Sequence, residues 1–92
     1  SDGKCAQLAA KTADVLKRVG ESPQVMRIID KCGSTWWWYR GQQVTIHGSH
    51  QVVLNGGKVY DLIAGVNGME KTEYLKHIAA EMNIQPILEV MK

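Results

Sequence analysis

Residues 47–61 read HGSHQVVLNGGKVYD. An apolar strand pattern, the turn sequence Asn-Gly-Gly and a second apolar pattern follow one another, which predicts a β-hairpin. A turn centred on Asn55-Gly56 would place His50 directly opposite Asp61, with Cβ atoms about 5 Å apart. A turn centred on Gly56-Gly57 would make Asp61 a diagonal neighbour of His50, about 7–8 Å away. Either register lets the Asp61 carboxylate hold the His50 imidazole.

Such a pair is either a cross-strand surface pair without a task or an oriented general base. In a general base, the aspartate accepts a hydrogen bond from one ring nitrogen and leaves the other nitrogen free to take a proton. His47 lies in the loop before the strand and is the less favoured candidate for the base. A base of this kind needs a nucleophile, and the chain offers two thiols, Cys5 and Cys32.

Cys5 is the favoured nucleophile because it opens the first predicted helix, over residues 5–19. Free N–H groups and the positive end of the helix dipole favour thiolate over thiol there, and Lys4 adds to the effect. The stretch CGSTW, from Cys32 onward, resembles a local signature of papain-type nucleophiles. That nucleophile opens a long helix, however, whereas the WWWYRG that follows Cys32 favours a strand. A Cys5–Cys32 disulfide is the alternative use of the two thiols.

The remaining pattern predicts an α+β fold with an antiparallel sheet, formed as a single domain over residues 1–92. Alanines line one flank of the first helix and permit close packing on a sheet, and Gly20 is expected to cap its end. The apolar stripe expected on this helix consists of Leu8, Val15, Leu16 and Val19. Strands are predicted over 24–30, 36–40, 43–47, 50–55 and 58–63, a second helix over 70–83, and a short piece of undetermined type over 87–92.

Composition narrows the class of protein. Hydrophobic residues make up 45% and charged residues 22% of the chain, as in ordinary globular domains. The net charge of +2 is spread along the chain, whereas a nucleic-acid reader has a concentrated basic patch, so we expect no nucleic-acid partner. No run of about 18 apolar residues predicts a membrane span. No Cys/His spacing predicts a metal site, and no cofactor is expected.

Several segments resemble papain-like cysteine proteases, and more narrowly the small papain-fold toxin domains at the C-termini of bacterial polymorphic toxins. The GxH…GKVYD segment is the most specific match. The order Cys, His, Asp is also similar to that of bacteriocin-processing peptidases that cut after double glycine. The matching segments are Cys5-Ala6, residues 16–20, Gly48-Ser49-His50 with Val52-Val53, residues 57–61, residues 65–68 and Glu73-Tyr74-Leu75.

The resemblance implies a papain-like minimal fold, in which an N-terminal helix packs on an antiparallel sheet with a C-terminal helix. It implies a catalytic triad in which Cys5 attacks a carbonyl carbon, His50 shuttles the proton and Asp61 orients His50. The backbone N–H of Cys5 would form part of an oxyanion hole. Papain-like enzymes usually carry a glutamine a few residues before the cysteine. Only Ser1 to Lys4 precede Cys5 here, which leaves the second oxyanion donor unassigned.

Three successive tryptophans, Trp36, Trp37 and Trp38, are candidates for lining a substrate groove or docking a partner. Core packing is the alternative for one or two of them. Since successive strand residues face opposite sides of a sheet, at least one must point away from the core.

The function that the resemblance implies is a cysteine protease toxin that cleaves peptide bonds of a target protein. Such a domain is secreted as part of a larger bacterial toxin in contact-dependent competition, acts in the cytoplasm of the recipient cell and is blocked by a cognate immunity protein. The first alternative is a glutamine deamidase or transamidase, because these enzymes share the triad and the acyl-enzyme step. Two further classes compete with it: a toxin ribonuclease that needs His50 but no thiol, and a non-catalytic binding module.

Overall fold

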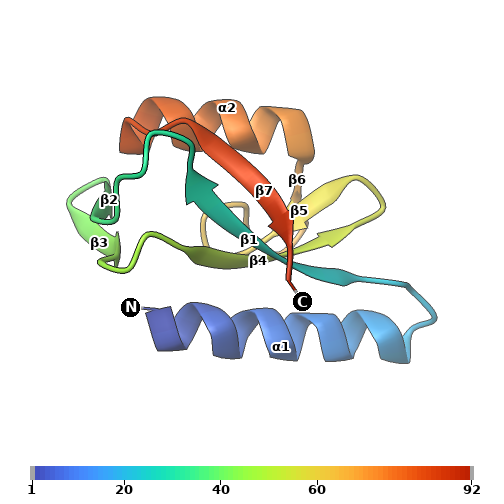
Figure 1. Ribbon diagram of the computed structural model, residues 1–92. Helices are drawn as coiled ribbons and strands as arrows, with labels where there is room; N and C mark the ends of the chain where they lie inside the picture. The colour runs from blue at the N-terminus through green and yellow to red at the C-terminus, as the bar shows by residue number, and fades with distance from the viewer. Residues whose placement is uncertain (1, 92) are drawn as a thin grey trace.

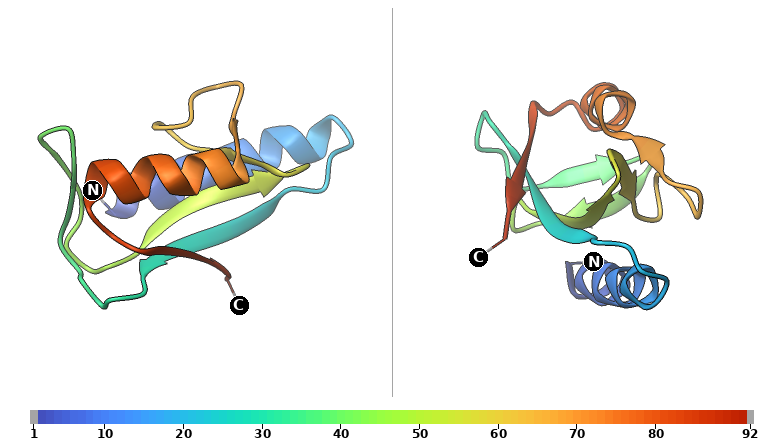
Figure 2. Two further views of the ribbon diagram at one scale, coloured as in Figure 1. Left: turned by 90° about the horizontal axis from the view of Figure 1, so that it is seen from above. Right: turned by 90° about the vertical axis from the view of Figure 1, so that its right-hand side faces the viewer.

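The computed structural model describes residues 2–91, with side chains from residue 4 onward. Five strands form an antiparallel sheet in the order β6-β5-β4-β1-β7, and β2 pairs with β3 in a separate ribbon. Helices α1 and α2 lie on opposite sides of the five-stranded sheet (Figures 1 and 2). This confirms the predicted α+β class, with an N-terminal helix, an antiparallel sheet and a C-terminal helix. The elements are α1 Asp2–Arg18, β1 Gln24–Asp30, β2 Trp37–Tyr39, β3 Gln42–Thr45, β4 His50–Asn55, β5 Lys58–Tyr60, β6 Met69–Glu70, α2 Lys71–Met82 and β7 Pro86–Val90.

Helix α1 begins three residues earlier than predicted, so Cys5 lies at the end of its first turn. Gly3 costs about 1 kcal/mol relative to alanine inside a helix, but it does not stop the helix here. At the other end, the N–H of Glu21 donates to the carbonyl of Leu16, and the N–H of Gly20 donates to that of Lys17. These two bonds form a Schellman cap around Gly20, whose φ is +88°, as the predicted cap requires.

The buried face of α1 is its alanine flank. Ala9 and Ala13 are buried and pack against Val53 of the central strand β4. The prediction of an apolar stripe on α1 is wrong for Val15 and Val19, which are exposed. Small side chains let the helix axis approach the sheet closely, and this approach turns the valines away from the sheet and toward solvent.

The hairpin of β4 and β5 uses the second of the two predicted registers. Asn55 faces Lys58, so Gly56 and Gly57 form the tip. Both glycines have positive φ, 58° and 80°, as the central positions of a type I′ turn require. Strand β5 ends at Tyr60, three residues before the predicted end, because the chain turns sharply after that point.

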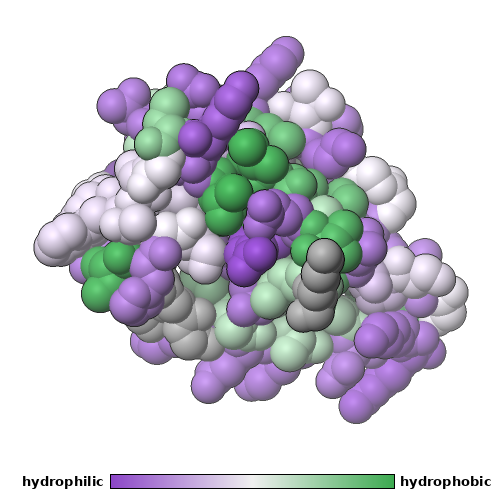
Figure 3. All heavy atoms as spheres, in the orientation of Figure 1, coloured by the Kyte–Doolittle hydropathy of each residue, from purple (hydrophilic) through white to green (hydrophobic). Residues whose placement is uncertain are grey.

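The larger part of the core lies between the sheet and α2. Trp37 of β2 and Tyr74 of α2 are its largest fully buried side chains. The final segment, whose type the sequence left open, is the edge strand β7 and pairs with β1 along its length. Figure 3 shows hydrophobic side chains near the middle of the face that Figure 1 presents. Two apolar side chains of β7, Ile87 and Val90, are exposed. Within residues 2–91, no helix is long and apolar enough to cross a membrane.

The close approach of α1 to the sheet predicts a strong size limit at Ala9. We expect Ala9→Leu to lower the free energy of unfolding by about 1–3 kcal/mol, because the larger side chain must push α1 off the sheet. Urea denaturation measures this change. The matched control is Ala10→Leu on the exposed side of the same helix, with an expected effect within about 0.5 kcal/mol. Equal losses in the two variants would contradict this packing.

Candidate active site

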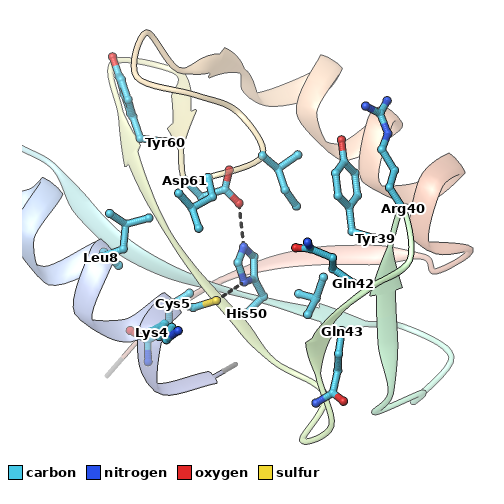
Figure 4. Close-up of a pocket in the computed structure, with 15 residues that line it drawn as sticks. Lys4, Cys5, Leu8, Tyr39, Arg40, Gln42, Gln43, His50, Tyr60 and Asp61 are labelled. Carbon is cyan, nitrogen blue, oxygen red and sulfur yellow. Dashed lines mark hydrogen bonds and ion pairs between the residues drawn. The ribbon is translucent and has the colours of Figure 1, made fainter.

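Three side chains from three parts of the fold meet beside α1. Cys5 comes from the first turn of α1, His50 is the first residue of β4, and Asp61 follows the last residue of β5. The Nδ1 of His50 lies 3.1 Å from the Sγ of Cys5, and its Nε2 lies 2.7 Å from the Oδ2 of Asp61. Figure 4 shows the imidazole between the sulfur and the carboxylate. The structure therefore brings together all three residues of the predicted triad.

The hairpin register explains how His50 meets Asp61. In the observed register, paired residue numbers sum to 113, as in Asn55 and Lys58. Continuing this pairing beyond the end of β5 would set Asp61 against Val52, which makes His50 its diagonal neighbour. The diagonal is short enough for the imidazole and the carboxylate to touch once the chain turns after Tyr60.

The carboxylate of Asp61 is almost fully buried, with 3% of its side chain exposed. Its Oδ2 accepts hydrogen bonds from the Nε2–H of His50 and from the hydroxyl of Tyr74, the latter at 2.5 Å. Its Oδ1 accepts from the backbone N–H of Ala64 at 2.7 Å. Three donors thus compensate the burial of one carboxylate, and they hold it at a fixed orientation toward His50.

These contacts set the protonation states of the site. Burial works against a charge on His50, but the hydrogen bonds and charges of Asp61 and Cys5 outweigh it and raise the pKa of His50 to about 9. Burial likewise works against the charge on Asp61, yet the hydrogen bonds from His50, Tyr74 and Ala64 hold the pKa of that carboxyl below its usual value. Burial and the adjacent Asp61 charge raise the pKa of Tyr74, so its hydroxyl stays protonated and donates. The site therefore holds an imidazolium against a carboxylate at neutral pH.

The three residues line an open pocket of about 630 Å³. On one side stand Leu8 of α1 and Tyr60 of β5, and on the other stands the β2–β3 ribbon with Tyr39 and Gln42 (Figure 4). The sulfur of the half-buried Cys5 thus faces a cavity large enough for part of a polypeptide.

The ribbon side of the pocket is tied to α2. The Tyr39 hydroxyl lies 2.7 Å from the Nε2 of His77, and Arg40 forms a 3.0 Å ion pair with Glu81. The guanidinium of Arg40 also lies 5.2 Å from the centre of the Tyr39 ring. His77 is half-buried and contacts Tyr39 of this wall rather than the triad.

Tyr74 is the residue of this site that the sequence reasoning missed. Tyr74 lies on the same face of α2 as the buried Ile78 and Met82, which is typical of a core side chain, and it is fully buried. A buried tyrosine hydroxyl usually finds a hydrogen-bond partner, which was the available signal. The partner, Asp61, could not be identified, because the pairing depends on how α2 crosses the sheet.

The structure separates the three tryptophans into one core residue and two exposed ones. Trp37 is 1% exposed and its indole N–H bonds to Ser34, so it is a core residue and is closed to substrate. Trp36 and Trp38 are exposed, as strand alternation requires for at least one of the three. None of the three is among the described residues that line the pocket.

The other candidate residues lie outside the site. Cys32 is an exposed free thiol in the turn after β1, and Cys5 is also free, so the alternative of a Cys5–Cys32 disulfide is not realised. His47 lies on the loop before β4, where its backbone N–H donates to Thr45, and the Asp61 carboxylate contacts His50 instead. Among the residues that the structure describes, no group of three or more His, Cys, Asp or Glu side chains could hold a metal ion.

Comparisons with protein-family models, curated proteins and solved structures find no match for this chain. The geometry of the site therefore carries the argument for function.

The raised pKa of His50 predicts a pH-dependent stability. The folded state favours the protonated ring, so this contribution is complete below pH 6.5 and is lost as pH rises through about 9. We expect the free energy of unfolding to fall across this window by about 3 kcal/mol, since one pKa unit corresponds to about 1.4 kcal/mol. Urea denaturation at a series of pH values measures the decline.

Two variants assign this decline to its source. His50→Ala should flatten the curve between pH 6.5 and 9, whereas His47→Ala should keep it. A slope that survives in His50→Ala would show that another group titrates.

Proposed function

We propose that this domain is a cysteine-dependent hydrolase of peptide or amide bonds that works through an acyl-enzyme. The observation that carries the proposal is the continuous contact from the Cys5 sulfur through the His50 ring to the buried Asp61 carboxylate, at the wall of an open pocket. Nucleophile, base and orienting group stand in the order that this chemistry requires.

The two ring nitrogens of His50 have different roles. Nε2–H stays bonded to Asp61, which leaves Nδ1 to exchange a proton near the sulfur. The Cys5 thiolate attacks the carbonyl carbon, and the electron pair of the carbonyl bond moves to its oxygen. The positive end of α1, from whose first turn Cys5 projects, stabilises this oxyanion.

The tetrahedral species then collapses. The carbon–nitrogen bond breaks while Nδ1–H of His50 protonates the leaving nitrogen, and a thioester on Cys5 remains. Nδ1 of His50 then deprotonates a water molecule, which attacks the thioester carbon and forms a second tetrahedral species. When this species collapses, the carbon–sulfur bond breaks, the acid is released and the thiolate is regenerated. Cleavage of a main-chain bond and deamidation of a glutamine side chain both follow this path. The product distinguishes them: shortened peptides in the first case, an intact target about one mass unit heavier in the second.

Site-resolved alkylation tests whether the Cys5 thiol is unusually reactive. With iodoacetamide at pH 6, we expect Cys5 to react at least about tenfold faster than Cys32, because the His50 imidazolium stabilises the attacking thiolate. Mass spectrometry of tryptic peptides reads the two sites separately in one sample. Cys32 is exposed and free, and so serves as an internal control.

Two variants connect this reactivity to the triad. His50→Ala should bring the Cys5 rate at pH 6 down by at least about tenfold. Asp61→Asn, which keeps the size of the side chain but removes its charge, should also lower the rate. Ordinary reactivity at both thiols of the unmodified protein would contradict a cysteine nucleophile.

We further propose, on the resemblance to papain-fold toxin domains, that the hydrolase acts as an antibacterial toxin in the cytoplasm of a recipient cell. A larger secreted protein would carry the domain, and a cognate immunity protein would cover the pocket. Expression inside a bacterium should stop growth, whereas Cys5→Ala should not. Cys32→Ala is the matched control and should remain toxic. Toxicity that survives Cys5→Ala would instead favour a ribonuclease that needs no thiol.

A further inference from the structure

An apolar groove runs on from the catalytic pocket along α1. Its volume is about 480 Å³. Four residues line both this groove and the catalytic pocket, so the two form one continuous depression: Leu8, Tyr60, Asp61 and Leu62. Beyond them, α1 forms one wall of the groove and the loop after β5 forms the other.

Large apolar side chains stand exposed around this groove. Val66 and Leu62 of the loop are 94% and 83% exposed, and Val15 of α1 is also exposed. Leu8 and Leu16 are half-buried along the helix wall. Apolar side chains held open around a concave surface are typical of a binding site.

Hydrogen bonds to Asp61 hold the loop after β5, which forms the outer wall of the groove. The backbone N–H of Ala64 donates to the Asp61 carboxylate, and the N–H of Gly65 donates to its carbonyl at 3.0 Å. The N–H of Gly68 then donates to the carbonyl of Gly65 at 3.1 Å. Gly68 lies so close to the Tyr60 ring that an added Cβ would come within 2.8 Å of it. These contacts place Leu62 and Val66 at the groove relative to the catalytic residues.

We propose that this groove binds large aliphatic or aromatic side chains of the substrate polypeptide, close to the carbonyl that Cys5 attacks. The inference rests on the proposed hydrolase function and adds the class of substrate to it. The groove is continuous with the pocket, and this favours the substrate polypeptide as its occupant. A polypeptide whose carbonyl lies at Cys5 extends beyond the pocket, and the groove offers it an apolar path.

The length of the groove determines which substrate residues can contact it. Along a helix, the rise of 1.5 Å per residue places Leu16 about 16 Å beyond Cys5. An extended peptide advances about 3.3 Å per residue, so about five substrate residues span the same distance. The groove therefore contacts substrate side chains at about the second to fourth positions from the attacked carbonyl, on one side of that carbonyl.

A peptide library with randomised positions on both sides of a central carbonyl tests the inference. The library is treated with the protein, and mass spectrometry reads both shortened peptides and products heavier by about one unit. For the unmodified protein, we expect Leu, Ile, Val, Met and Phe to be enriched at one or more of the second to fourth positions, on one side of the altered carbonyl.

Two variants on separate walls, Val15→Asp and Val66→Asp, should each reduce this enrichment at least about fivefold, because covering a carboxylate with an apolar side chain costs desolvation free energy. The matched control, Val19→Asp, alters another exposed valine, which is not among the residues that line the groove, and should keep the enrichment. Circular dichroism is used to check that each variant is folded.

The outcomes separate the two proposals. Products without apolar enrichment, or enrichment that Val15→Asp and Val66→Asp leave intact, overturn the groove inference while the hydrolase stands. If the unmodified protein gives no product that Cys5→Ala abolishes, the hydrolase proposal is overturned, and the inference fails with it.

Discussion

The arrangement of the site depends on one constraint, the burial of the charged carboxylate of Asp61. An uncompensated charge in the interior costs several kcal/mol, so Asp61 must be supplied with donors. They come from three parts of the fold: His50 from β4, Tyr74 from α2 and Ala64 from the loop after β5. A single side chain thus links the hairpin, the C-terminal helix and the loop wall. Since Asp61 receives its last donors only when these elements are in place, the site becomes complete only with the tertiary fold.

The position of Cys5 depends on a different feature, the small side chains of α1. Ala9 and Ala13 bury almost no bulk and let α1 lie close to β4, which brings the sulfur within 3.1 Å of His50. The same packing leaves Val15 at the surface, where it faces the groove beside the loop. The exposed valine and the buried alanines are therefore two consequences of one helix orientation.

The local part of the site was predictable from the sequence, and the tertiary part was not. His50 and Asp61 are joined by a hairpin whose turn residues restrict the register to two choices, and both choices bring the pair together. Cys5 was identified from its place near a helix start, although the helix begins earlier than predicted. The role of Tyr74 and the burial of Trp37 depend on how α2 and β2 pack across the sheet, which local periodicity does not encode. The strand β7 was undetermined because an edge strand acquires its structure by pairing with β1.

A structural role alone is a poor explanation for a cysteine, a histidine and an aspartate in this arrangement. Buried ion pairs are often no better for stability than apolar side chains of similar volume, and they cost desolvation free energy. A fold that needed only to join β4, β5 and α1 would gain more from packing leucine or valine at these positions. The imidazolium instead lies between a buried carboxylate and a half-buried sulfur that opens on a pocket. The raised pKa of His50 keeps this positive charge in place at neutral pH. A charge maintained at this cost, beside a free thiol within reach of ligands, is the observation that supports the covalent catalysis proposed above.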